Sequence, residues 1–286
     1  MTTITLNDTT AYRLPSTWNE LTADNLLLVI DKLQQYDKAD ATVQAEIKTE
    51  LVLLLSGLRL PEGMTDITVE KDGETFAEAE IRNKLLPAIA FLFEKNTLTK
   101  QLFPKIRIRK RFRVKHLYGP SDNFMNLSFG EFDDAEYFFS IITAQAELTD
   151  ERLIEIANAL NMFCAILYRE YEERKGDSRI AYSAHDNEAR AEWFSRADAN
   201  LKAAILFWYI GCRNQLESDF APLFESKKGS ETNVTWTMLA HSLAGPVLGN
   251  IDDVFARNIR QVFTEMLRLF NQAEEMEANS PDVLPG

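Results

Sequence analysis

The sequence has 286 residues and a formal net charge of −13, with 45% hydrophobic and 26% charged residues. This composition is typical of a globular chain and excludes extended disorder. Apolar runs such as LLLVI and LVLLL are far shorter than the roughly 20 residues that cross a bilayer. The first ten residues lack the basic and apolar regions of a signal peptide, so we expect a cytoplasmic protein with no membrane partner.

The first part of the chain is predicted to combine hairpins with helices. Asp72-Gly73 between β-like arms predicts a hairpin, and Thr22 is the predicted N-cap of a helix. Alternating residues and turn residues predict the hairpins, and apolar residues at helical spacing predict the helices. The predicted hairpins lie near residues 2–14 and 67–76, and the predicted helices over about 23–36, 42–58 (ended by Pro61 and Gly63) and 77–95.

A basic segment follows, residues 105–115, with the sequence KIRIRKRFRVK. It holds seven cations and no acid, whereas the rest of the chain has 24 Lys and Arg against 44 Asp and Glu, a net charge of −20. Side chains on a strand alternate faces, so the spacing predicts one strand with an apolar face, broken by Lys110, and a cationic face. A solvated or internally paired strand face is the alternative to a binding role for these cations. Our predicted partner-binding residues are the cations of that face, Lys105, Arg107, Arg109, Arg111, Arg113 and Lys115.

After Tyr118 the chain is predicted to be helical almost to its end. Ser128 and Glu131 have the spacing of a capping box at the start of the first helix. The predicted fold is therefore α+β, predominantly helical, with a small antiparallel sheet formed by the two hairpins and the basic strand. The later predicted helices cover about 149–173, 188–214, 234–248 and 251–277, with polar loops over 174–188 and 222–233.

This change of elements divides the chain into an N-terminal α+β part, 1–118, and a C-terminal helical part, 119–286, which ends in a loose tail, 279–286. One continuous domain is the alternative.

Cys164 and Cys212 lie among apolar residues, which predicts two buried thiols. The aromatic residues crowded over 124–139 predict core packing, with an exposed partner-binding patch as the alternative.

No arrangement of residues predicts catalysis. The three histidines have no second ligand at metal-binding spacing, and no Gly-rich phosphate loop or nucleophile motif occurs. The acidic segment GEFDDAE, 130–136, could serve a metal-dependent nuclease, but it also suits the first turn of a helix, where the macrodipole favours carboxylates. We expect a protein that is not an enzyme, with no catalytic residue, metal or cofactor; an enzyme with a dispersed site is the alternative.

Several short motifs resemble a group of uncharacterised tail-module and structural proteins of tailed phages and prophages of Bacteroidetes. They share a Gly-Pro-x-Asp segment, an Asn-Leu-Thr/Ser cap, an acidic-aromatic helix and an Ala-x-Leu-Tyr-Arg helix end. Residues 18–22, near the start of the chain, and Trp236 and Gly249, near its end, also fit the resemblance. The matching residues are Gly119, Pro120 and Asp122, then Asn126, Leu127 and Ser128, and the segment Ala165 to Arg169.

The resemblance implies a tail assembly chaperone or a minor structural component, in the cytoplasm of a bacterial host or incorporated in the virion. The expected partners are other phage tail or virion proteins, or a second copy of the chain. The alternative is a nucleic-acid-binding protein that uses residues 105–115. The acidity of the remaining chain disfavours that alternative, because it repels phosphates over about 8–10 Å at physiological salt.

Overall fold

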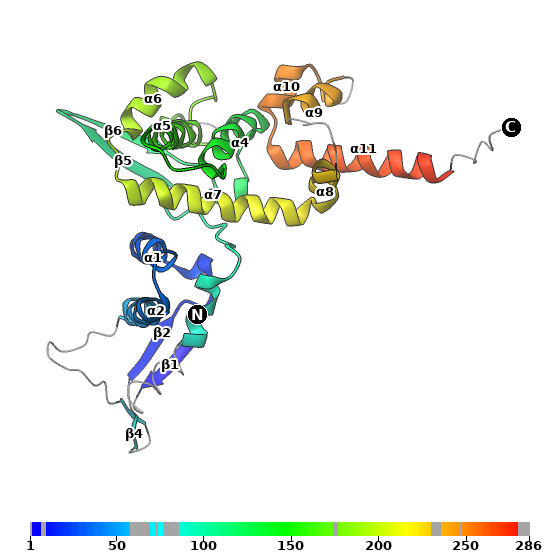
Figure 1. Cartoon of the computed structure of the whole chain (residues 1–286). Coiled ribbons are helices and arrows are strands. Elements are labelled where there is room, and N and C mark those ends of the chain that lie inside the picture. Colours follow the sequence, from blue (N-terminus) through cyan, green and yellow to red (C-terminus); the bar gives the residue numbers. More distant parts are fainter. Residues whose placement is uncertain are drawn as a thin grey trace. The chain divides into compact units, whose positions relative to one another are not determined.

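The computed structural model describes residues 2–6, 10–57, 69–71, 74–76, 86–173, 177–229, 236–245 and 248–279. The chain forms two compact units, the first comprising Met1–Leu102 and Asp198–Gly211 and the second comprising Phe103–Ala197 and Cys212–Gly286. The basic segment 105–115 therefore belongs to the second unit, although the sequence-based division placed it with the N-terminal part. Figure 1 shows the order of the elements along the chain.

In the first unit, the predicted hairpins and first two helices are present where the structure describes them. Thr22 Oγ1 accepts a hydrogen bond from the Asn25 amide and caps the first helix as predicted. The second helix ends earlier than predicted, because Gly57 adopts a left-handed conformation with φ of 70°. The elements are β1 (Thr2–Leu6), β2 (Thr10–Leu14), η1 (Trp18–Glu20), α1 (Ala23–Tyr36), α2 (Ala41–Ser56), β3 (Val69–Lys71), β4 (Glu74–Phe76) and the 3-10 helix η2 (Leu86–Phe93). Residues 77–85 of the predicted third helix lie outside the described residues.

The core of the first unit includes a close contact between the segment after η2 and α7 (Ala199–Asp219). Trp208 Nε1 donates to the Thr99 carbonyl over 3.2 Å, and Asn96 Nδ2 donates to the Phe207 carbonyl over 2.6 Å. Gly211 fits against the same segment, because an added Cβ there would lie 2.2 Å from the carbonyl oxygen of Leu98. This helix position therefore requires the absence of a side chain.

The second unit is mostly helical, and several boundaries differ from the predicted ones. The predicted helix over 188–214 is two helices, and most of the predicted loop over 222–233 is helical in its described residues. Of the predicted tail, 279–286, only residue 279 is described. The elements are β5 (Lys105–Lys110), β6 (Arg113–Tyr118), η3 (Asp122–Phe124), α4 (Phe129–Thr143), α5 (Asp150–Leu167), η4 (Ala184–Asp186), α6 (Asn187–Phe194), the last part of α7, α8 (Ala221–Gly229), α9 (Trp236–Leu243), α10 (Ile251–Ala256) and α11 (Ile259–Asn279).

Helix α5 ends at Leu167, before the predicted end, because the next residues leave the helix to pair with β6. The Tyr118 amide donates to the Arg169 carbonyl over 2.7 Å, and the Arg169 amide donates back over 3.0 Å. This β-bridge competes with continued helix and fixes the end of β6 to the body of the unit.

Of the aromatic residues over 124–139, Phe124, Phe129 and Phe132 lie in the core as predicted, whereas Tyr137 is 63% exposed. Phe132 contacts Phe263 on α11 with ring centroids 5.7 Å apart, and Phe263 stacks on Trp236 at 5.0 Å. Phe224 packs against both of these rings. These contacts join α4, α8, α9 and α11 through aromatic pairs, each of which adds stability beyond its buried area.

Polar residues form a second, ionic part of this core. Ser128 and Glu131 make the predicted capping box, and Glu131 is 1% exposed. Its Oε1 lies 2.8 Å from Arg179 Nη1 and 3.0 Å from Arg169 Nη2. Both arginines are buried, and Asp177 Oδ1 accepts from Arg179 Nε over 2.9 Å. Burial lowers the pKa of Arg169 to about 10, while Glu131 and Asp177 oppose this shift and keep the guanidinium protonated at neutral pH.

The α+β, mostly helical fold class is confirmed, but the predicted single sheet is wrong. Within the described residues the strands form three separate two-stranded antiparallel sheets, β1–β2, β3–β4 and β5–β6. Each described strand pairs with the strand next to it in sequence. None of the described helices is both long enough and apolar enough to span a membrane.

Candidate functional site: a basic hairpin

The basic segment is a β-hairpin and not the single strand that its alternation predicted. Strand β5 turns back at Arg111-Phe112, so that Lys110 pairs with Arg113 and Lys105 pairs with Tyr118. The turn is missed from sequence because it has none of the usual residues, such as Asn-Gly. Arg111 has a φ of 52°, a left-handed conformation that costs a non-glycine residue of the order of 1 kcal/mol or more.

The two-residue turn changes which residues share a face. Odd positions of β5 pair with even positions of β6, so Arg107 lies opposite His116 and Arg109 lies opposite Val114. The predicted face of six cations is therefore wrong. One face holds the outward Lys105, Arg107 and Arg109, and the other holds Arg113 and Lys115 together with the apolar side chains that enter the core.

The base of the hairpin is held firmly against the second unit. Ile106, Ile108 and Leu117 are buried, and the bridge from Tyr118 to Arg169 joins the last residue of β6 to the buried ionic core. Burial and main-chain hydrogen bonds fix the direction of both strands, so the hairpin is held more firmly than a free loop would be.

Two of the cations are neutralised within the chain. Lys110 Nζ lies 2.6 Å from Glu192 Oε1, and Lys115 pairs with Glu170. Both ammonium groups also lie over the ring of Trp193, at 5.9 Å and 5.5 Å from its centroid. The hydrogen bond from Lys110 lowers the pKa of Glu192. Burial opposes ionisation of Glu170, but the hydrogen bond and charge of Lys115 bring its pKa below the ordinary value.

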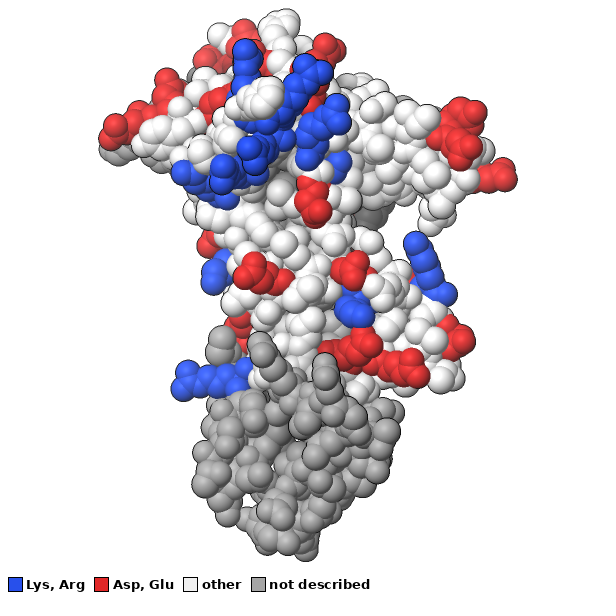
Figure 2. All heavy atoms as spheres, turned by 90° about the vertical axis from the view of Figure 1, so that its left-hand side faces the viewer, with Lys and Arg blue, Asp and Glu red and all other residues white. Residues whose placement is uncertain are grey.

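The four arginines of the hairpin are exposed. Within the part of the chain that the structure describes, Arg107, Arg109, Arg111 and Arg113 form no ion pair. Phe112, at the tip between Arg111 and Arg113, is 100% exposed. In Figure 2 lysine and arginine gather over the region of this hairpin on the face in view. The hairpin therefore presents uncompensated guanidinium groups around one exposed aromatic ring.

The acidic segment 130–136 does not form a metal site. Glu131 binds two arginines, Asp133 accepts from Thr237 over 2.7 Å, and Glu136 lies 2.8 Å from Arg213. Tyr182 donates to Asp134, and burial together with this hydrogen bond raises the pKa of that tyrosine. No group of three or more His, Cys, Asp or Glu residues that could hold a metal occurs in the described ranges. These carboxylates join α4 to other segments of the second unit.

Sequence reasoning selected the cations but missed the residue at the tip. Lys105 makes a cation–π contact, since its ammonium lies 5.3 Å from the centroid of the Tyr118 ring. Strand alternation predicts that Phe112, an even position, lies on the apolar face, whereas the turn places it in solvent. Phe112 is a lone aromatic residue with an arginine on each side. This pattern is the signal in the sequence that could have indicated the tip of a hairpin.

Comparison of the chain with protein-family models, with curated proteins and with solved structures found no match.

Proposed function

We propose that this chain is a non-enzymatic binding protein that captures an acidic protein partner with the β5–β6 hairpin. The observation that carries the proposal is the set of four exposed arginines without a carboxylate partner among the described residues, beside two lysines that have one. A planar guanidinium binds a carboxylate through two parallel hydrogen bonds, and such pairs are strongest where water is excluded. The sequence resemblance suggests the setting, which is the assembly or structure of a tailed-phage particle.

The charge of the whole chain favours a protein partner over nucleic acid. Outside residues 105–115 the net charge is −20, which repels a polyanion at distances of about 8–10 Å or less at physiological salt. An acidic protein presents a few carboxylates at chosen positions and does not carry a continuous array of phosphates. Such a partner can therefore contact the tip while its other surface remains neutral or basic.

A nucleic-acid-binding function is the second candidate, and one specific observation favours it. Phe112 stands between Arg111 and Arg113 at the tip, so an aromatic ring and guanidinium groups are exposed together. Proteins that bind single strands combine cations that follow the backbone with aromatic rings that stack on bases, at about 1–3 kcal/mol per base. This candidate predicts tight, salt-sensitive binding of single-stranded oligonucleotides.

The test compares the wild-type chain with a variant in which Arg107, Arg109, Arg111 and Arg113 are all replaced by Gln. Each is expressed together with the other virion proteins of its phage, and co-purifying proteins are identified by mass spectrometry. We expect the wild type to retain an acidic virion protein in a salt-sensitive manner and the Gln variant to lose it. A matched variant with Lys at the same four positions should retain part of the binding, because charge remains while paired hydrogen bonding is lost.

Fluorescence anisotropy with labelled single- and double-stranded oligonucleotides tests the second candidate. We expect no binding at physiological salt for either the wild type or the Gln variant. Tight binding by the wild type that the Gln variant loses would overturn the proposal and establish the nucleic-acid function. Retention of the same protein partner by wild type and Gln variant would show that the hairpin is not the binding element.

A further inference from the structure

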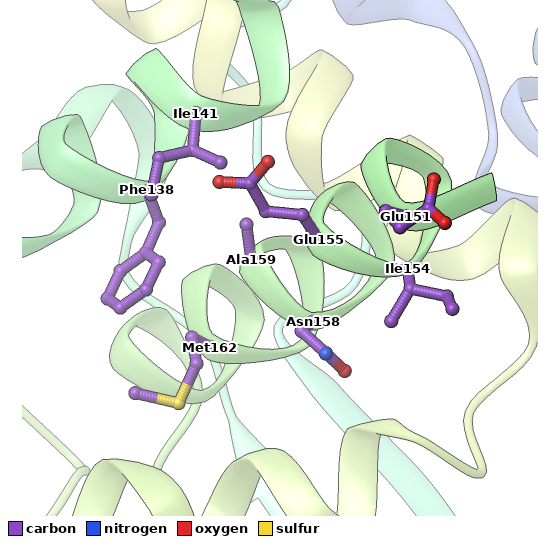
Figure 3. A pocket seen from close by; sticks show the side chains of 8 residues that line it. All are labelled: Phe138, Ile141, Glu151, Ile154, Glu155, Asn158, Ala159 and Met162. Carbon is purple, nitrogen blue, oxygen red and sulfur yellow. The ribbon is translucent and has the colours of Figure 1, made fainter. Parts of the chain in front are cut away.

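An apolar groove lies between α4 and α5, in the same unit as the hairpin. It has a volume of about 390 Å³, and its apolar lining includes Phe138, Ile141, Ile154 and Met162. Figure 3 shows Phe138 and Ile141 extending from α4 and Met162 and Ile154 from α5. Ile154 is 63% exposed, so part of this apolar lining is in contact with water.

The lining does not suit a small polar ligand. Pockets for such ligands place a few converging polar groups within an apolar wall. Here the polar side chains are Glu151, Glu155 and Asn158, and all three extend from α5. An apolar anchor flanked by cations matches this arrangement better, because the anchor fills the groove and the cations meet the acidic side.

We infer that the occupant is the β5–β6 hairpin of a second copy of this chain. Phe112 of one copy enters the α4–α5 groove of the other, and Arg111 and Arg113 meet the carboxylates on α5. The inference rests on the proposed function and adds to it an acidic surface, on a second copy of this chain, that the same hairpin binds. The hairpin supplies an exposed aromatic ring with uncompensated positive charge, and the groove supplies exposed apolar surface with an acidic side.

The charges at the groove leave an excess of acid. Arg152 is the cation at this site, and it is already bound, because its Nη1 lies 2.6 Å from Glu155 Oε2 and its Nη2 donates to the Ile141 carbonyl. Glu151 and Asp150 occupy the first turn of α5 and form no ion pair with any residue that the structure describes. These two carboxylates are therefore available to incoming arginines, and the exposed pair of Glu155 is weak enough to be shared.

The geometry of this contact has a consequence for assembly. The hairpin and the groove are different surfaces, and Phe112 is fully exposed and so does not occupy the groove of its own chain. Contacts between two different surfaces join subunits head to tail, and they produce rings or open filaments unless two copies exchange hairpins reciprocally. A single ring with a few ion pairs buries much less than the roughly 1,200 Å² of a stable interface, so each contact should be weak and dependent on concentration.

The test is sedimentation velocity of the full chain over a wide range of concentrations, at low and high salt. Phe112→Ala should weaken self-association by at least about tenfold, as loss of a central aromatic anchor does. Ile154→Arg should have a similar effect by placing a cation in the groove. Matched controls are Val114→Ala on the same hairpin and Leu153→Arg, because Leu153 is 50% exposed on α5 but does not line the groove. Both controls should associate like the wild type.

Mixing provides a second, stricter measurement. The Phe112→Ala chain retains an intact groove and the Ile154→Arg chain retains an intact hairpin. An equimolar mixture should therefore form a one-to-one complex at concentrations where each variant alone stays monomeric. All of these substitutions are at exposed positions, and circular dichroism should show unchanged folding.

Each other outcome overturns the inference in a distinguishable way. If only Phe112→Ala weakens association, the hairpin binds another surface, and the proposed function stands without this partner site. If only Ile154→Arg does, the groove holds a different segment. If neither does, or if the wild type is monomeric throughout, the second copy is not the occupant, and the proposed function is then judged by retention of the virion protein alone.

Discussion

Replacing Glu131 with Gln should destabilise the second unit severely, although the two side chains have nearly the same shape. Glu131 is 1% exposed and faces Arg169 and Arg179, which are 2% and 0% exposed. The carboxylate accepts from both guanidinium groups and from the Ser128 amide, over 3.0 Å, 2.8 Å and 3.0 Å respectively. An amide can preserve the capping box, since Gln serves at that position, but it removes the negative charge.

The size of the loss in stability follows from the buried positive charge that remains without Glu131. Without Glu131, two buried arginines share Asp177, and breaking a buried ion pair from one side typically costs about 3–5 kcal/mol. For a unit of this size each kcal/mol lowers the melting temperature by about 2–4 °C, so the expected fall is roughly 6–20 °C. Differential scanning calorimetry measures this fall, and hydrogen exchange of peptides from α4 and α5 assigns it to the second unit.

A surface ion pair provides the matched control. Glu265 lies 2.5 Å from Arg268 on α11, and both side chains are solvent-accessible. Glu265→Gln should leave the melting temperature nearly unchanged, because exposed ion pairs contribute little to stability. A variant with both Glu131→Met and Arg179→Met should lose less than the sum of the two single changes, because it removes both members of the pair. Equal effects of Glu131→Gln and Glu265→Gln, or strict additivity in the double variant, would refute this account of the ionic core.

Two further predictions concern buried positions. Cys164 and Cys212 are buried thiols, and burial raises the pKa of Cys212 above its ordinary value. Both should therefore resist alkylation in native buffer and react in denaturant. Rapid labelling of both in native buffer, detected by mass spectrometry, would contradict this. Gly211→Ala should destabilise the first unit by about 1–3 kcal/mol or more, because the new Cβ would meet the Leu98 backbone at 2.2 Å. Gly245→Ala, where an added Cβ has no neighbour within 4 Å, serves as its control in thermal unfolding, and equal melting points for the two variants would contradict the packing argument.

The sequence alone determined the features that depend on neighbouring residues. The Ser128–Glu131 capping box, the Thr22 cap and the hairpin around Asp72-Gly73 each require residues only a few positions apart, and the described parts of all three are present. The apolar surroundings of Cys212 likewise indicated burial. Local hydrogen bonding and hydrophobic spacing act over the same short range as these patterns, so the patterns suffice.

Tertiary contacts decided the shape of the candidate site. Alternation in residues 105–115 is equally compatible with one strand or with two, because it specifies faces and not the path of the chain. The hairpin is selected by burial of Ile106, Ile108 and Leu117 and by the bridge from Tyr118 to Arg169, which lies 51 positions further along. These contacts hold a turn that Arg111 and Phe112 do not favour locally. A ring predicted to lie on the apolar face of a strand therefore stands in solvent between two arginines that form no ion pair with any described residue.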